Sequence, residues 1–221
     1  IHELYAGLLS DATTVRATFH RYVIDANRDP SGTSLYPGQN TTGLVPETDF
    51  DGEAIWKEGE APTEEDIAYR LQHFHAPYHA ALAAEIERVK AIHGVAILYD
   101  CHSIRSHIPF LFEGKLPDFN IGTDMGKTCD PAVEAIAVDV TSAAEGYTSI
   151  LNGRFKGGWT TRHYGQPDKG VHAIQMELAQ CTHLKTETPP FAYDDDKGAK
   201  LRTHLKTILT RMEDFALALR P

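Results

Sequence analysis

Cysteine is scarce in this chain of 221 residues, and its three copies, Cys101, Cys129 and Cys181, form no CxxC pair. An odd count without such a pair argues against a disulfide framework or a cysteine-based zinc knot, and it is typical of a reducing compartment. No apolar run approaches the ~18 residues that would span a membrane. Residues 1–5 carry neither a basic leader nor the apolar core of a signal peptide. We therefore expect a cytoplasmic protein without a membrane partner.

Basic residues are also in short supply, with 21 lysines and arginines against 31 aspartates and glutamates and a net charge of −10. Because nucleic-acid binding needs a basic face, this balance argues against a nucleic-acid partner. A net-acidic protein can still bind a small anion through a local cluster of arginines. The length suits one compact domain over residues 1–221, and nothing in the sequence indicates an oligomeric state.

Apolar periodicity predicts helices that alternate with strands, the pattern of an α/β sheet with helices on both faces. We expect helices over residues 64–93, 131–144 and 197–219, and strands over residues 15–25, 95–99, 147–151, 159–164 and 172–179. Pro77 should kink or split the first helix. Between residues 29 and 59 the chain is rich in Gly, Pro, Thr and Asp, which predicts a long irregular loop.

Two places in the sequence could supply histidine ligands for a metal. Asp100 and His102 lie at the carboxyl end of a predicted strand, where residues i and i+2 share one face. A histidine beside a carboxylate suits a metal ligand, but an ordinary core pair has the same pattern. His75 and His79 are four residues apart, yet Pro77 between them argues against a helical metal pair.

Glu177 is the candidate general base. It lies in a run of otherwise apolar or small residues, so burial should raise its pKa toward neutrality. A buried glutamate that is satisfied by a salt bridge is the alternative interpretation.

Four arginines fall at predicted strand ends or in nearby loops: Arg28, Arg105, Arg154 and Arg162. Guanidinium groups bind carboxylates in a bidentate fashion, and each charged hydrogen bond contributes ~1.5–3 kcal/mol. Their grouping in an acidic protein suggests a dicarboxylate substrate. The same spacing is compatible with scattered surface charges.

Several segments of the chain read together as one known pattern. They are residues 23–28 (VIDANR), 99–106 (YDCHSIRS), 116–123 (LPDFNIGT), 152–158 (NGRFKGG), 161–165 (TRHYG) and 172–180 (HAIQMELAQ). Over nearly the whole chain they resemble the N-formylglutamate amidohydrolase (N-formylglutamate deformylase) family of bacterial histidine degradation. The resemblance implies a phosphorylase/hydrolase-like fold, a mixed α/β sheet flanked by helices as in zinc carboxypeptidase-like amidohydrolases.

The resemblance also implies a catalytic metal and a base. His102 is similar to a metal ligand of that superfamily, with Asp100 as a further ligand or as the carboxylate that orients His102. Glu177 is similar to the general base. The implied cofactor is a divalent metal, with Zn²⁺ as the first candidate. Such a metal lowers the pKa of bound water to about 7 and polarises the formyl carbonyl, and Glu177 takes the proton of that water.

The substrate contacts are implied in the same way. Asn27 and Arg28 resemble the pair that grips a substrate carboxylate in that family, and Arg105 and Arg162 are expected to hold the other carboxylate. The expected reaction is hydrolysis of N-formyl-L-glutamate to formate and L-glutamate, and the acyl pocket should be small and closed by the loop that begins at Asp29.

One departure concerns the beginning of the chain. The family usually has a Pro-His-x-Gly segment and an Asp-Thr-Asp-Trp-like segment ahead of the helix in which Ile1 lies. Those segments should supply the remaining metal ligands, because catalytic zinc typically has three protein ligands. We therefore expect that this chain lacks an N-terminal strand segment of the family.

Two other functions remain open at this point. The first is a related amidohydrolase that acts on another N-acyl acidic amino acid, which relative rates on N-formyl- and N-acetylglutamate would distinguish. The second is a non-catalytic binding protein for acidic amino acids, for which metal content and formate release would be decisive.

Overall fold

The computed structural model describes residues 1–35, 38 and 40–219. Four strands of these residues form one sheet in the order β1-β4-β2-β3. Their bounds are Ala96–Ile104 (β1), Phe119–Gly122 (β2), Ser149–Leu151 (β3) and Val171–Ala179 (β4). β1 is parallel to β4 and β3 is parallel to β2, whereas β2 is antiparallel to β4. The sheet is therefore mixed, as the sequence resemblance implies.

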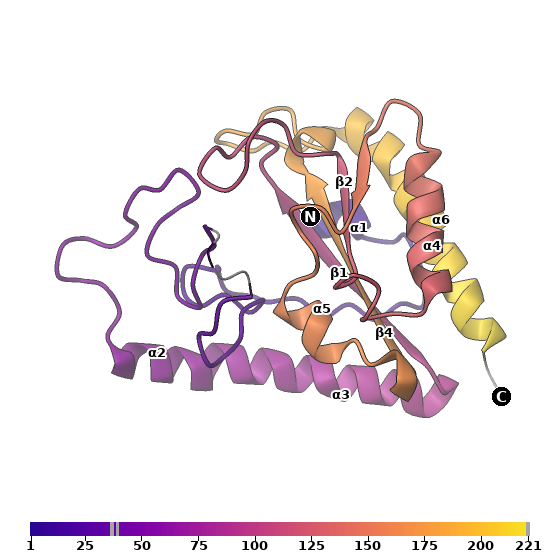
Figure 1. Ribbon diagram of the computed structural model, residues 1–221, viewed down its shortest axis with the longest axis horizontal. Coiled ribbons are helices and arrows are strands. Elements are labelled where there is room, and N and C mark those ends of the chain that lie inside the picture. Colours follow the sequence, from indigo (N-terminus) through magenta and orange to yellow (C-terminus); the bar gives the residue numbers. More distant parts are fainter. Residues whose placement is uncertain (36–37, 39, 220–221) are drawn as a thin grey trace.

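Helices cover both faces of this sheet. Their bounds are His2–Tyr5 (α1), Glu64–Arg70 (α2), Leu71–His75 (η1, a π-helical turn), Ala76–His93 (α3), Pro131–Ser142 (α4), Trp159–Tyr164 (α5) and Asp195–Ala218 (α6), with short 3-10 turns at Pro167–Lys169 (η2) and Gln180–Thr182 (η3). α2, η1 and α3 form one long rod along one face, next to α5 (Figure 1). α4 and α6 pack together on the opposite face. This arrangement confirms the expected α/β fold class.

The helix ends follow from local chemistry. Thr63 caps α2 through a capping box, in which its hydroxyl accepts from Asp66 N–H and the Asp66 carboxylate accepts from Thr63 N–H. Gly94 ends α3 in the left-handed region, with φ of 76°. Asp130 caps α4 by accepting from Ala132 N–H. These three boundaries confirm the helix starts and stops expected from the sequence.

The main core lies between the sheet and the α4/α6 layer. Ile174, Met176 and Leu178 of β4 are fully buried there against Leu201 and Leu205 of α6. Burying each such side chain contributes about 1.5–3 kcal/mol. Because side chains alternate along a strand, the residues between them on β4 face the other side of the sheet, where α3 and α5 lie. That alternation puts Gln175 and Glu177 on the face opposite the main core.

The strand predicted over residues 15–25 is wrong. This segment is irregular coil and turn, and its backbone hydrogen bonds go to nearby or loop residues, such as Val23 N–H to His20 O and Asp25 N–H to Leu44 O at 2.7 Å. Of the apolar residues that suggested a strand, Ile24 is fully buried, whereas Ala17 is exposed, so the apolar pattern reflects single contacts and not one buried strand face.

The strand predicted over residues 159–164 is also wrong, because these residues form α5. The rings of Trp159 and His163 stack at 4.2 Å, a contact that the i, i+4 spacing of a helix allows and a strand does not. β2 has no counterpart among the predicted strands, since its four residues include the polar Asn120 and end at Gly122.

The expected interruption of the first long helix is the turn η1, which ends two residues before Pro77. The described residues between 29 and 59 form the expected irregular loop, and among them an isolated bridge joins Thr48 and Ala54. Within the described ranges, no helix has both the length and the apolar character required to cross a membrane.

Candidate active site

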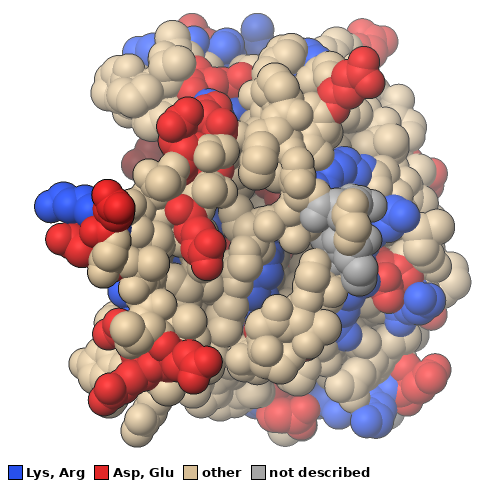
Figure 2. Space-filling model, turned by 60° about the vertical axis from the view of Figure 1, so that its left-hand side comes forward, with Lys and Arg blue, Asp and Glu red and all other residues tan. Residues whose placement is uncertain are grey.

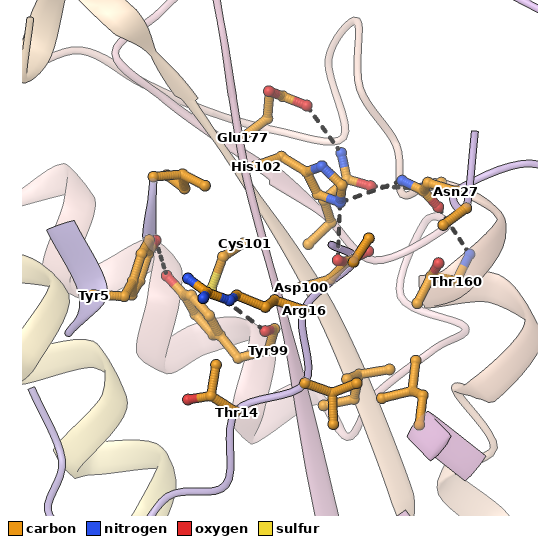
Figure 3. Close-up of a pocket in the computed structure, with 18 of the residues that line it drawn as sticks. Tyr5, Thr14, Arg16, Asn27, Tyr99, Asp100, Cys101, His102, Thr160 and Glu177 are labelled. Atoms are coloured by element: carbon orange, nitrogen blue, oxygen red, sulfur yellow. Dashed lines mark hydrogen bonds and ion pairs between the residues drawn. The ribbon is translucent and has the colours of Figure 1, made fainter. Parts of the chain in front are cut away.

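Four polar side chains from two neighbouring strands form one patch on the sheet. The parallel pairing of β1 with β4 places Asp100 beside Gln175 and His102 beside Glu177. Partners in register project to the same face, so all four side chains share the face opposite the main core. Figure 3 shows Glu177, His102 and Asp100 on the same side of β1, with Tyr99 and Cys101 directed away from them. The predicted shared face of Asp100 and His102 is thereby confirmed, and Glu177 joins them.

His102 is held from two sides. Its Nε2 atom lies 2.8 Å from Asp100 Oδ1 and 3.3 Å from Asn27 Nδ2. Burial by itself would lower the pKa of His102, but the adjacent Asp100 carboxylate outweighs it and raises that pKa to about 9. His102 therefore carries a positive charge at neutral pH in this arrangement.

Glu177 is buried, with 7% of its surface exposed. Burial raises the pKa of its carboxyl group to about 7, while the positive charges of His102 and Arg21 oppose the rise. Gln175 lies next to it, with Nε2 3.5 Å from Glu177 Oε2 and with Oε1 accepting from Gly158 N–H at 2.6 Å. A carboxyl group with a pKa near neutrality can take up and release a proton at physiological pH.

Asn27 connects the loop over the site to the sheet. Its Oδ1 atom accepts from the N–H of Thr160 at 2.9 Å, and its Nδ2 atom contacts His102. Gly158 makes this approach possible, since a Cβ atom at Gly158 would lie 2.6 Å from Asn27 Cγ. The glycine-rich loop thus provides the room in which the Asn27 side chain reaches His102.

Two histidines on the long helical rod hold the backbone on both sides of Asn27. His79 Nε2 donates to Ala26 O at 2.8 Å, and His75 Nε2 donates to Arg28 O at 3.0 Å. Burial lowers the pKa of both imidazoles, to about 4 for His79, so each ring is neutral at physiological pH. The centroids of the two rings lie 4.3 Å apart, so Pro77 does not separate them as the sequence argument supposed. Each Nε2 atom serves a backbone carbonyl.

The polar patch on the sheet faces a cavity of about 1330 Å³. Asn27, Asp100, His102 and Glu177 line it, together with residues 32–35 and 40–44 of the long loop. Figure 2 shows basic side chains recessed in the middle of one face of the molecule, with acidic side chains gathered to their left. The cavity is larger than the usual ~300–1,000 Å³ of small-molecule sites. The small size of the acyl pocket within it stays a prediction.

The predicted arginines do not all lie at this cavity. Arg28 lines it, and its guanidinium group donates to Thr42 O, Thr42 Oγ1 and Asn27 O. Arg105 pairs with Asp51 at 2.8 Å and Arg162 pairs with Asp124 at 3.3 Å. Neither Arg105 nor Arg162 is among the described residues that line the cavity. Their contact with a substrate stays a prediction.

Sequence reasoning missed two polar residues of the site. Gln175 lies two residues before Glu177, so the alternation that paired Asp100 with His102 could have found it. Arg21 lines the cavity and pairs with the buried Asp25. No local pattern distinguishes Arg21, because its position depends on how an irregular segment folds over the sheet.

The donor set around His102 is smaller than the one a catalytic metal requires. Within the part of the chain that the structure describes, no three His, Cys, Asp or Glu side chains are close enough together to hold a metal ion. His102 and Asp100 supply one imidazole and one carboxylate, whereas catalytic zinc typically has three protein ligands. The described residues therefore do not by themselves fit a zinc ion.

Comparisons with known proteins agree with the sequence resemblance. The family model of N-formylglutamate amidohydrolase matches residues 1–184. The curated N-formylglutamate deformylase of Pseudomonas aeruginosa is 50% identical over 198 residues, which cover 90% of this chain and 74% of that protein. The Pseudomonas putida protein of the same name is 49% identical and covers 90% and 73%.

Solved structures agree as well. The crystal structure of N-formylglutamate amidohydrolase from Ralstonia eutropha JMP134 superimposes with a TM-score of 0.66 at 25% identity, over 90% of this chain and 74% of that one. The family match, the identity to the two curated proteins and the shared fold lead to one conclusion. This chain belongs to the N-formylglutamate amidohydrolase family and is a hydrolase that acts on an amide.

Proposed function

We propose that this protein hydrolyses N-formyl-L-glutamate to L-glutamate and formate, as a late step of histidine degradation in the cytoplasm. The observation that carries the proposal is the buried carboxyl group of Glu177 beside His102, on one wall of a cavity. The names of the Pseudomonas relatives, N-formylglutamate deformylase, support the choice of substrate.

Glu177 acts as the general base. In its ionised form it takes a proton from a water molecule while the water oxygen bonds to the formyl carbon. The C–N bond of the resulting tetrahedral intermediate then breaks, and the proton on Glu177 passes to the departing amine. Formate and the free amino group of glutamate are the products. The pKa of about 7 lets Glu177 both accept and return this proton at neutral pH.

The neighbouring residues hold the reacting groups in place. Asp100 lies 2.8 Å from His102 Nε2 and orients the imidazole, which the strand register places beside Glu177. Asn27 and Arg28 bind a substrate carboxylate in this proposal, and Arg105 and Arg162 bind the other. Binding the carboxylates orients the formamide against Glu177, which lowers the entropic cost of the reaction.

A divalent metal, in the first place Zn²⁺, is a separate part of the proposal. His102 is its proposed ligand, with Asp100 either as a second ligand or as the group that orients the imidazole. Such an ion needs at least one protein ligand more than these two residues supply. The catalytic steps above are assigned to residues of this chain alone.

The decisive experiment replaces the proposed base. We expect Glu177→Gln to lower formate release from N-formyl-L-glutamate by about 10²–10⁴-fold, since general base catalysis contributes this much. The matched control is Glu213→Gln, which removes an exposed carboxylate from another part of the same cavity wall and should retain wild-type turnover. Unchanged turnover in Glu177→Gln would contradict the assignment of the base.

The same preparations test the metal and the acyl group. Stoichiometric metal in the wild-type protein that is lost in His102→Ala supports the metal proposal. The large cavity leaves room for a bulkier acyl group, so rates on N-formyl- and N-acetylglutamate are compared. A faster rate on the acetyl compound would favour the related N-acyl amidohydrolase, and binding without any formate release would favour a non-catalytic binding protein.

A further inference from the structure

We propose that Arg21 binds one of the two carboxylates of the substrate. The sequence did not single out this residue, and the proposed function above assigns the carboxylates to other side chains. The inference rests on the proposed function, because it takes N-formylglutamate as the ligand.

The guanidinium group of Arg21 has unused hydrogen-bond donors. An arginine carries five N–H donors. Among the residues that the structure describes, the hydrogen bond of Arg21 runs from Nη2 to Asp25 Oδ2, and its Nε atom is buried without any partner. Buried donors without partners cost about 1–3 kcal/mol each, so they are rare in folded proteins. The charge of Arg21 is paired with Asp25, so what an anionic ligand in the cavity could complete is the hydrogen bonding of the remaining accessible N–H groups.

The side chain of Arg21 is also held in place. Asp25 is buried and fixes Nη2, while its other oxygen accepts from the N–H of Asn27 at 3.0 Å. On another side the guanidinium lies over the Phe50 ring, 5.2 Å from its centroid. About a third of the side chain (35%) remains accessible. A group that is fixed before the ligand arrives loses little conformational entropy on binding.

Arg21 lies where a substrate carboxylate would be. It lines the same cavity as His102 and Glu177, and Asp25 connects it to the segment that presents Asn27. Two other arginines of the cavity wall are tied to the backbone instead. Arg28 donates to Thr42 O and Asn27 O, and Arg154 donates to Leu111 O and Asn40 O. Those contacts organise loops. Arg28 also pairs with Asp25 Oδ2 at 3.4 Å, so more of its N–H groups are occupied within the protein than those of Arg21.

The test measures dissociation constants by calorimetry for three ligands: N-formyl-L-glutamate, its γ-amide (N-formyl-L-glutamine) and its α-amide (N-formyl-L-isoglutamine). Charged hydrogen bonds of ~1.5–3 kcal/mol correspond to roughly 10- to 100-fold in affinity. Arg21→Met should weaken N-formylglutamate by about that factor. The same substitution should also weaken the binding of whichever amide retains the carboxylate that Arg21 contacts. The affinity for the other amide, which lacks that carboxylate, should stay within about twofold of the wild-type value.

A second variant and a control make the result interpretable. Arg21→Lys keeps a cation for Asp25 but loses the guanidinium fork, so it should show the same pattern of affinities. It replaces Arg21→Met in the test if circular dichroism shows that Arg21→Met folds poorly. Arg16→Met is the matched control, because exposed Arg16 lines the same cavity near Tyr99, on the other side of β1 (Figure 3). Its affinities should stay unchanged.

Two outcomes would overturn the inference: an equal loss of affinity for all three ligands in both Arg21 variants, or no loss for N-formylglutamate. Formate release by the wild-type protein is recorded in parallel. Its absence together with the expected pattern of affinities would reject the proposed reaction but leave the role of Arg21 standing.

Discussion

The Asn27 side chain connects three parts of the site. It contacts His102 on β1, accepts from Thr160 N–H at the start of α5, and belongs to a loop whose neighbouring carbonyls are held by α3 and η1. No space is left between its amide and Gly158, because a Cβ at that glycine would lie 2.6 Å from Asn27 Cγ. The position of Asn27 is therefore sensitive to a single added methyl group.

We expect Gly158→Ala to displace the Asn27 amide, since the new Cβ would overlap it. The amide is the end of a side chain and can move, so the main effect should fall on catalysis, with kcat/KM lowered about tenfold or more and the unfolding transition little changed. Formate release and urea unfolding measure the two effects. Gly43→Ala is the control, because the nearest atom to its added Cβ is Val45 O at 3.8 Å. Equal activity of the two variants would show that Asn27 has no positioning role.

At this scale the sequence predicts some side chains well and others not at all. The neighbourhood of Asp100 and His102 followed from strand alternation, which is a local rule. Glu177 was recognisable because it is charged within an apolar run. Arg21 could not be found in this way, since an irregular segment brings it to the cavity and no periodicity records such a path.

The elements around the site differ in how strongly they constrain it. β1 and β4 are paired over nine residues in a continuous parallel register, from Ala96 with Val171 to Ile104 with Ala179. The long rod of α2, η1 and α3 constrains the site at its π-helical turn, a feature that is often found at functional sites. This turn precedes α3, and the two histidines at 75 and 79 hold the Asn27 loop from there.

We expect His79→Ala to destabilise the protein by about 2–4 kcal/mol. It removes the bonds to Ala26 O and Tyr164 Oη and leaves the partly buried Ala26 carbonyl without this donor. His73→Ala is the matched control on the same rod, because His73 is exposed and should cost less than about 0.5 kcal/mol. Urea unfolding of both variants gives the comparison. A similar cost for both would mean that His79 does not anchor the loop.

Element prediction succeeded where caps or long apolar runs are present. Thr63, Gly94 and Asp130 mark helix ends that the structure reproduces. It failed over residues 159–164, where Trp and Thr favour strands in isolation. There the stacking of Trp159 on His163 and their contacts with the long rod stabilise a helix instead. Tertiary contacts overrode local propensity in this segment.

The response of the whole molecule to acid follows from groups whose pKa differs between the folded and unfolded chain. Burial lowers the pKa of His79 and His183 from 6.5 to about 4, so between these values the unfolded chain binds more protons and stability rises with pH. Glu177 acts in the opposite direction. Its folded pKa of about 7 lies above 4.5, so its contribution to stability decreases as pH rises between those values. The lowered pKa of His75 acts in the same direction as those of His79 and His183, whereas the raised pKa of His102 acts above pH 6.5, so we expect greater stability at neutral pH than at pH 4.

We expect His183→Gln to reduce this pH dependence. Between about pH 4 and about pH 7.5, the unfolding free energy of the wild-type protein should increase more than that of the variant. The difference should be about 3 kcal/mol, which is the pKa shift of His183 converted at 1.36 kcal/mol per pKa unit. His183 is almost fully buried and was not assigned to the candidate site, so its effect can be separated from catalysis. Urea unfolding at both pH values provides the measurement. An identical pH dependence in the variant would contradict the assigned shift.

At the scale of the molecule, composition and alternation were enough to predict an α/β fold with helices on both faces. The strand order β1-β4-β2-β3 and the antiparallel placement of β2 were not predictable. Which strands become neighbours depends on packing between segments that are distant along the chain. The volume of the cavity depends in turn on how the long loop lies over that sheet.

The pairing of β1 with β4 has a consequence for how the protein tolerates length changes. The four polar groups of the patch occupy every second position of two strands, and the positions between them carry side chains such as Tyr99, Cys101 and Met176. Loss or gain of one residue early in either strand would exchange odd for even positions and put an aromatic ring or a thiol on the sheet face that carries the patch, in place of a carboxylate. Insertions and deletions should therefore be confined to the loops, while these two strands keep a constant length.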